Sequence, residues 1–208
     1  MSQATNEQSQ VADLWFDPAC PWAWMTSRWL LHVEQVRPVT TRFHVMSLAL
    51  LNRNRDGLSE GYSEFAQRAL GPVRVCIAAA HKDGDEVLGP LYTALGERIH
   101  RQQRAVDRAL VEEALAEVGL PVDLAGAMDS AEYDEALEVS HNDGINRVGL
   151  DVGTPVISVE GVSFFGPVVS PAPKGEAAGR LWDGVLLVAG TDGFFELKRT
   201  RDRSPVFD

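Results

Sequence analysis

The feature that most restricts the fold is a long stretch, residues 58–148, in which almost no strand pattern occurs. Strand-like segments lie on either side of it. Before it come the apolar run VADLWF (11–16) and the alternating segment TTRFHVMSL (40–48). After it comes TPVISVEGVSFFG (154–166), which is typical of a hairpin with a tight turn at Glu160-Gly161. This order predicts an α/β domain interrupted by a large, all-helical insertion.

Helical spacing of apolar residues predicts four helices. They span 22–36, 105–118, 130–141 and 176–190. Pro38 follows the first helix and Gly119 the second, while Ser130 opens the third. The chain therefore reads strand-helix-strand, helical insertion, strand-strand-helix.

This order also predicts how the chain divides into domains. We assign 11–57 together with 149–192 to the α/β domain, and 58–148 to the inserted helical domain. Residues 1–10 are expected to form a disordered N-terminal tail, and 193–208 a C-terminal extension.

Composition narrows the class of partner. The net charge of −11 argues against a broad nucleic-acid surface, because phosphate binding depends on Lys and Arg. The first ten residues contain neither an apolar run nor a basic cluster, and no segment approaches the 18 apolar residues of a membrane helix. The five histidines show no paired metal spacing, so we predict no metal site. We expect a soluble cytoplasmic protein that acts on small molecules and keeps its two cysteines reduced, with a homodimer as one possible assembly.

The segment FDPACPWAW (16–24) carries the chemistry. It places Cys20 between a strand and a helix, where unpaired N–H groups and the helix dipole stabilise a thiolate. Pro21 suits the first helical turn because its missing N–H would be unpaired there. We therefore expect a reactive, partly ionised thiol at Cys20, the alternative being an ordinary buried cysteine. Cys76, in the apolar stretch VRVCIAAAH, is expected to fill the core.

Three segments carry a resemblance to the DsbA-like branch of the thioredoxin fold. They are FDPACPWAW, ALGERIHRQQRAVDRALVEEALAEVGL and VGTPVISVEGVSFFGP. The second also looks like kappa-class glutathione transferases and their isomerase relatives. The resemblance is strongest to actinobacterial mycothiol-dependent oxidoreductases and nitroreductases, through WFDPACPWAWMTSRW, FHVMSLALLNRNRD and FFELKRTR. In that subgroup the motif is usually Cys-Pro-Trp-Cys, whereas this chain has Ala23 in place of the second cysteine.

The resemblance implies roles for residues outside the motif. In the thioredoxin fold a cis-proline faces the active-site cysteine, so Pro155 takes that place and Thr154 offers its backbone to a thiol substrate. A strand that begins at a trans proline is the alternative. Asn52 and Tyr62 match positions that line the thiol pocket, although a helix cap and core packing explain them equally well.

Together these expectations define a candidate site. We assign catalytic roles to Cys20, Trp22 and Pro155, and thiol binding to Pro21, Asn52, Tyr62 and Thr154. For Trp22 the alternative is packing within the nearby cluster of tryptophans.

Ala23 determines which mechanism is open to this site. Without a second cysteine, a disulfide formed on Cys20 must be resolved by a thiol from outside. We therefore predict a monothiol oxidoreductase that uses mycothiol, with disulfides, nitro compounds or quinones as substrates. One alternative is a transferase or isomerase in which Cys20 only steadies a bound thiol cofactor. Another is a non-catalytic thiol-binding module, and the sequence does not show whether Ala23 is natural or introduced.

Overall fold

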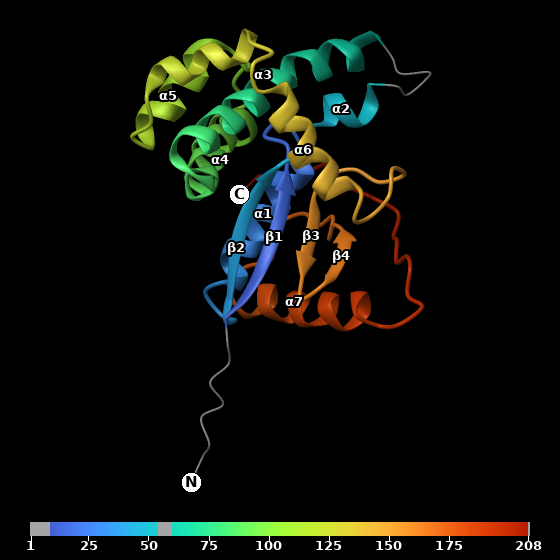
Figure 1. The fold of residues 1–208 in the computed structure, drawn as a ribbon. Helices are drawn as coiled ribbons and strands as arrows, with labels where there is room; N and C mark the ends of the chain where they lie inside the picture. The colour runs from blue at the N-terminus through green and yellow to red at the C-terminus, as the bar shows by residue number, and fades with distance from the viewer. Residues whose placement is uncertain (1–8, 54–59, 208) are drawn as a thin grey trace.

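The computed structural model describes residues 9–53 and 60–207, with the backbone alone for residues 60 and 62–67. Its centre is a four-stranded sheet of order β2-β1-β3-β4 (Figure 1). Strand β1 (Gln10–Phe16) runs parallel to β2 (Val39–Val45) and antiparallel to β3 (Val156–Val159), which forms a hairpin with β4 (Val162–Phe165). Strands from both ends of the chain thus meet in one sheet, as the order of segments predicts.

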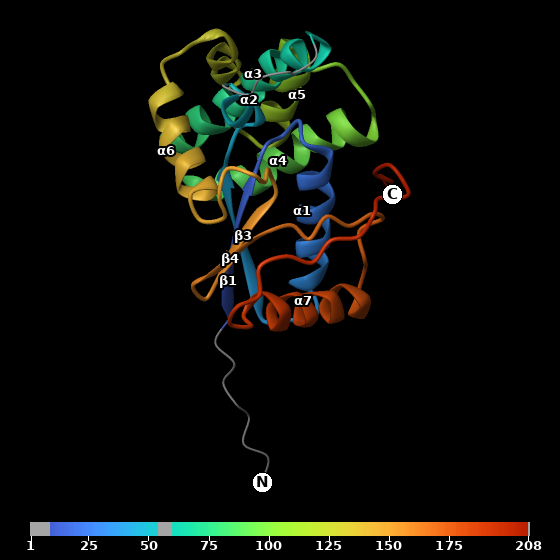
Figure 2. The ribbon, with the colours of Figure 1, turned by 90° about the vertical axis from the view of Figure 1, so that its right-hand side faces the viewer.

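Helices cover both faces of this sheet (Figure 2). Helices α1 (Pro21–Val33) and α7 (Glu176–Ala189) lie on one face, and α6 (Asp134–Ile145) lies on the other. The alternation of β1 explains both contacts, because successive side chains of a strand point to opposite faces. Phe16 belongs to the large core on the α1 face, whereas Trp15 packs in a smaller cluster with Ile145, Val156 and Met46.

The elements that the structure describes between β2 and β3 are all helical. They are α2 (Leu48–Asn52), α3 (Glu60–Asp83), the 3-10 turn η1 (Asp85–Val87), α4 (Leu88–Gly96), the π-helical turn η2 (Glu97–Arg101), α5 (Arg108–Glu117), the 3-10 segment η3 (Val122–Asp129) and α6. Most of them form a layer across one end of the sheet (Figure 1). The predicted helical insertion is therefore observed in this part of the chain, while the exact division into 11–57, 58–148 and 149–192 stays a prediction.

Side-chain caps shift several helix and strand ends from their predicted places. The strand predicted over 40–48 ends at Val45, because the Ser47 hydroxyl accepts the Leu50 N–H and starts α2. The helix predicted over 105–118 begins only at Arg108, since the Asp107 carboxylate accepts the Leu110 N–H.

Two other helices also differ from their predicted spans. The helix predicted over 22–36 ends at Val33, before the turn that leads to Pro38. The helix predicted over 130–141 runs from Asp134 to Ile145, because the preceding residues form the η3 segment and a turn. The hairpin turn is confirmed, with positive φ at both Glu160 (49°) and Gly161 (82°).

The chain ends in a segment without helix or strand, residues 191–207. It leaves α7 and runs back beside α1 toward the helical layer (Figure 2). The Val206 N–H anchors it by donating to Ser170 Oγ over 2.8 Å. The predicted tail 1–10 lies almost wholly outside the described residues. Among the described helices, none has the length and apolar character needed to cross a bilayer.

Candidate functional site

The loop between β1 and α1 is shaped by a buried acid, Asp17. One of its carboxylate oxygens accepts the Ala19 N–H and the other the Leu48 N–H, each over 2.8 Å. Its backbone carbonyl accepts the Cys20 N–H at 2.9 Å. These bonds fold the chain into a tight turn, so that Cys20 becomes the residue that caps α1.

The sulfur of Cys20 lies between this helix and the loop before β3. It accepts the Ala23 N–H over 3.4 Å and donates to the Thr154 carbonyl over 3.5 Å. The Thr154 hydroxyl is tied to the Trp15 carbonyl at 2.9 Å, and the Thr154-Pro155 peptide bond is cis. Residues 134 positions apart in sequence therefore meet at one sulfur atom.

Burial dominates the electrostatics of Cys20. Its side chain is only 4% exposed, and this desolvation raises the pKa of the thiol to about 12. The negative charge of Asp17 adds to the increase, while the Ala23 N–H and the charge of Arg201 oppose it. The expectation of a partly ionised thiol is therefore wrong for this arrangement: the helix N-terminus is present, but burial outweighs it.

The other residues of the motif lie around the sulfur. Pro21 occupies the first turn of α1, as predicted. Trp22 is half-buried against the core, and the Arg201 guanidinium lies over its ring, 5.2 Å from the centroid. Ala23 is fully buried, and it stands at the position where a second cysteine would carry the resolving sulfur.

Two predicted pocket residues are less well defined. Asn52 is buried at the end of α2, and its amide donates to the Leu48 carbonyl within the same helix over 2.8 Å. Tyr62 belongs to α3, but its side chain lies outside the described residues. Thiol binding by both residues stays a prediction.

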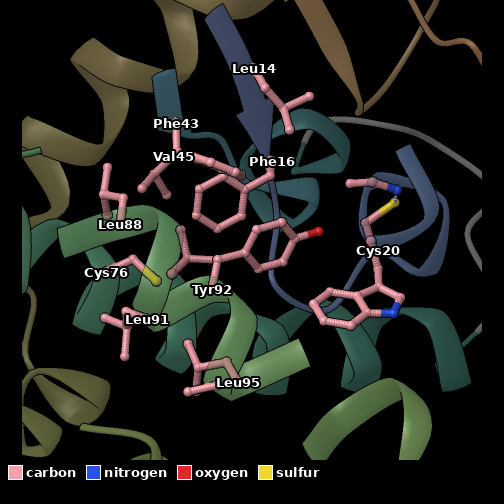
Figure 3. Packing of buried hydrophobic residues seen from close by; sticks show 14 of the residues in the cluster. Leu14, Phe16, Cys20, Phe43, Val45, Cys76, Leu88, Leu91, Tyr92 and Leu95 are labelled. Atoms are coloured by element: carbon pink, nitrogen blue, oxygen red, sulfur yellow. Dashed lines mark hydrogen bonds between the residues drawn. The ribbon is translucent and has the colours of Figure 1, made fainter. Parts of the chain in front are cut away.

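Cys76 is fully buried in α3 and is not paired with Cys20. Figure 3 shows it beside Leu88 and Leu91, with the Tyr92 ring between the two sulfur atoms. Burial raises its pKa further than that of Cys20. Its position is that of a core residue.

Three neighbours of the site were missed by sequence reasoning. Asp17 follows a buried strand directly, and a charged residue at that position could have been recognised from the sequence as a candidate site residue. Tyr92, stacked on Phe16 with ring centroids 3.9 Å apart, points its hydroxyl toward Cys20 (Figure 3). His100 donates to the Pro18 carbonyl over 2.8 Å, and burial lowers its pKa to about 4, so that it is neutral. Both come from the helical layer, and no local pattern marks them.

Among the side chains that the structure describes, no cluster of three or more His, Cys, Asp or Glu could hold a metal ion.

Comparison with known proteins places this site in context. Residues 19–199 match the Rv2466c-like family, described as mycothiol-dependent nitroreductase Rv2466c. The uncharacterized protein Rv2286c of Mycobacterium tuberculosis is 27% identical over 198 residues, covering 94% of this chain and 84% of that protein.

Solved structures share the fold. A probable DsbA oxidoreductase, SCO1869 from Streptomyces coelicolor, superposes with a TM-score of 0.56 at 14% identity, covering 95% of this chain and 93% of that one. The cytosolic disulfide reductase DsbM from Pseudomonas aeruginosa, solved with GSH, gives 0.56 at 17% identity, covering 85% and 99%. The fold is therefore the DsbA-like thioredoxin fold with a helical insertion.

Proposed function

Because the chain belongs to the Rv2466c-like family of mycothiol-dependent nitroreductases and is a DsbA-like thiol-dependent oxidoreductase, we propose that Cys20 is its single redox-active thiol and that mycothiol is its co-substrate. The observation that carries the proposal is the pair of contacts at the sulfur. Cys20 caps a helix and touches the backbone of Thr154, with a methyl group at position 23 where a resolving sulfur would stand. This arrangement favours attack by one sulfur and resolution from outside.

The proposed reaction has two exchange steps. The Cys20 thiolate attacks the mycothiol sulfur of a mixed disulfide between substrate and mycothiol. The S–S bond breaks, the substrate leaves as a thiol with the proton that Cys20 released, and Cys20 keeps mycothiol as a disulfide. A second mycothiol attacks that disulfide, regenerates the Cys20 thiol and leaves as oxidised mycothiol.

The thiol occupies the space beside Cys20 in this proposal. The Thr154 carbonyl, which accepts the Cys20 S–H at 3.5 Å, becomes free to accept an N–H of the incoming thiol once the sulfur reacts. Pro21, Trp22 and Pro155 supply apolar walls, while Asn52 and Tyr62 supply polar groups for the sugar hydroxyls. Two mycothiol molecules also deliver two electrons and two protons, enough to reduce a quinone to a hydroquinone, or a nitro group to a nitroso group and water.

A second candidate follows from the protonated sulfur. A Cys20 thiol that keeps its proton can donate a hydrogen bond to the thiolate of a bound cofactor, which then acts as the nucleophile of a transferase or isomerase. Serine can make the same hydrogen bond. Cys20→Ser therefore separates the two functions, since it abolishes disulfide exchange but tolerates hydrogen bonding.

The experiment is an intact-mass measurement after incubation with oxidised mycothiol. We expect one mycothiol adduct per chain, on Cys20, which persists until reduced mycothiol is added and which Cys20→Ser abolishes. The matched control Cys76→Ser should still form it. Mycothiol should form and release the adduct faster than glutathione, by about 10-fold if the pocket discriminates through polar groups that would otherwise stay unpaired.

The possible results separate the parts of the proposal. Equal rates with both thiols would remove mycothiol from it but leave the monothiol mechanism. If neither mycothiol nor glutathione forms an adduct on Cys20, although Cys20 reacts with alkylating agents, the result would support the non-catalytic binding module. Activity retained by Cys20→Ser would support the transferase or isomerase.

A further inference from the structure

A cavity of about 340 Å³ lies between α1, η2, the loop before α7 and the end of the C-terminal segment. Its apolar walls come from Met25 and Leu31 near α1, Ala172 of the loop and Phe207 of the terminal segment. Cys20 is not among the described residues that line it. The cavity is large enough for a small organic molecule and is distinct from the site around the sulfur.

The Arg28 guanidinium of α1 forms part of the wall of this cavity. Its central carbon lies over the Trp24 ring, 4.0 Å from the centroid. Its Nε donates to Ser27 Oγ over 3.3 Å, and its Nη2 donates to Thr93 Oγ1 over 3.1 Å. The ring and the two hydroxyls together hold a long side chain in one position, so the cation is already oriented before any ligand arrives.

The positive charge of Arg28 lacks a carboxylate in contact with it. Among the described residues none forms an ion pair with this guanidinium, and its Nη1 donates no hydrogen bond. Burial disfavours the charge and lowers the pKa of Arg28, while the negative charge of Glu97 opposes this effect. Glu97 is itself paired with Arg101 at 2.9 Å. A partly buried cation with an unused N–H group is costly, and an anion in the cavity would offset that cost.

The remaining charges of the cavity also favour an anion. Arg101 and Lys174 are exposed residues that line it, and Glu97 is the one carboxylate among the described lining residues. This excess of cations occurs on a chain whose net charge is −11. Positive potential is therefore concentrated at this cavity, although the molecule as a whole is acidic.

We propose that the cavity binds an organic carboxylate with a small apolar or aromatic body, and that Arg28 holds the carboxylate. The planar guanidinium suits two carboxylate oxygens, and the apolar walls suit the body of the ligand. This binding site goes beyond the redox function proposed for Cys20 and does not depend on it.

Two probes of the same shape test the inference on the full chain. 4-Fluorobenzoate is anionic and 4-fluorobenzamide is neutral, and fluorine NMR follows the binding of each. We expect the benzoate to bind with a dissociation constant on the order of 1 mM or below, at least about tenfold tighter than the amide. Arg28→Gln should abolish this preference. Arg28→Lys should keep part of it, because the charge remains while the planar fork is lost.

Two further variants separate binding from folding, since Arg28 also contacts its neighbours in the core. Arg101→Gln changes an exposed side chain and releases Glu97, so it should weaken benzoate binding about threefold. Arg108→Gln removes an exposed arginine of α5 that does not line the cavity, and it should bind like the parent.

The outcomes distinguish this inference from the proposed function. Equal affinities for the two probes, the lack of saturable binding by the parent, or full binding by a folded Arg28→Gln would overturn the inference. The function of Cys20 would stand in each case, because the mycothiol adduct measures it separately. Cys20→Ser should bind the benzoate like the parent, and loss of binding in this variant would place the probe at the thiol site and overturn the inference too.

Discussion

Cys20 is subject to opposing influences that decide when it reacts. The helix N-terminus and Arg201 favour the thiolate, whereas burial and Asp17 favour the thiol, and the result is a pKa of about 12. At pH 7 a thiol with so high a pKa is almost wholly protonated. Reaction at neutral pH therefore requires a change in the surroundings of the sulfur that lowers the pKa of the thiol. Binding of a partner or local opening of the residues that bury Cys20 would produce such a change.

The pH dependence of alkylation checks this description. Cys20 should be labelled by iodoacetamide in the native protein, and its rate should rise about tenfold per pH unit between pH 7 and pH 9, because the thiolate is the nucleophile. Cys76, fully buried, should be labelled only after unfolding. Peptide mapping after brief treatment distinguishes the two. Labelling of Cys76 ahead of Cys20 would contradict the assignment of the nucleophile.

Position 23 tests the geometry of the motif. Ala23 donates its N–H to the Cys20 sulfur over 3.4 Å from the first turn of the same helix. We expect Ala23→Cys to close a disulfide with Cys20 under mild oxidant, since the two side chains lie about one helical turn apart. Intact mass should show the loss of two hydrogens and thiol titration the loss of both groups. The control is Ala69→Cys, at a buried position in a different helix, α3, and it should not form a disulfide with Cys20.

At this scale the sequence predicts what is local. Cys20, Pro21 and Trp22 are adjacent in sequence and share one physical explanation, the start of a helix. The meeting of Cys20 with Thr154 follows from the resemblance to a known fold. Neither source predicts the strength of burial at the sulfur, because Tyr92, whose hydroxyl points toward Cys20 (Figure 3), comes from a helix far away in the sequence.

At the scale of elements, apolar spacing predicts where helices and strands occur, and caps decide where they begin and end. Val106 fits the apolar stripe of the helix predicted over 105–118, yet α5 begins only after Asp107 caps it. Ser47 similarly ends a strand pattern by starting a helix. Hydrogen bonds of single polar side chains override periodicity at these ends.

The contact between α4 and α1 offers a sharp test of element packing. A Cβ at Gly96 of α4 would overlap the indole ring of Trp24, which is buried in the helix that carries Cys20. We expect Gly96→Ala to lower the free energy of unfolding by about 1–3 kcal/mol through overpacking. Gly184→Ala in α7, where nothing lies within 4 Å of the new Cβ, should instead raise it by up to about 1 kcal/mol. Denaturant unfolding of both variants measures the contrast, and equal effects would contradict the packing.

At the scale of the whole molecule, two buried groups give stability opposite pH dependences. Burial raises the pKa of Asp17 from 3.8 to about 6, so its effect on stability is most favourable below pH 3.8 and is lost as pH rises through 6. Burial lowers the pKa of His100 from 6.5 to about 4, so its contribution is present above pH 6.5 and is lost as pH falls through 4. Between pH 4 and pH 6 the contributions of Asp17 and His100 to the free energy of unfolding change in opposite directions and largely cancel. The stability of the parent protein therefore shows neither pH dependence clearly.

Removing one carboxylate should reveal the cancellation. In Asp17→Asn only the pH dependence of His100 and the remaining groups is left, so the stability of the variant relative to the parent should fall by about 2 kcal/mol between pH 7 and pH 4. The absolute stability is a poorer measure, because an amide cannot accept both the Ala19 and the Leu48 N–H. Asp123→Asn, which changes an exposed carboxylate of η3, should follow the parent across this range. If the free energies of unfolding of Asp17→Asn and the parent change with pH in the same way from pH 7 to pH 4, Asp17 does not titrate in a buried site. The assignment of Asp17 as the negative charge that raises the pKa of Cys20 would then be contradicted.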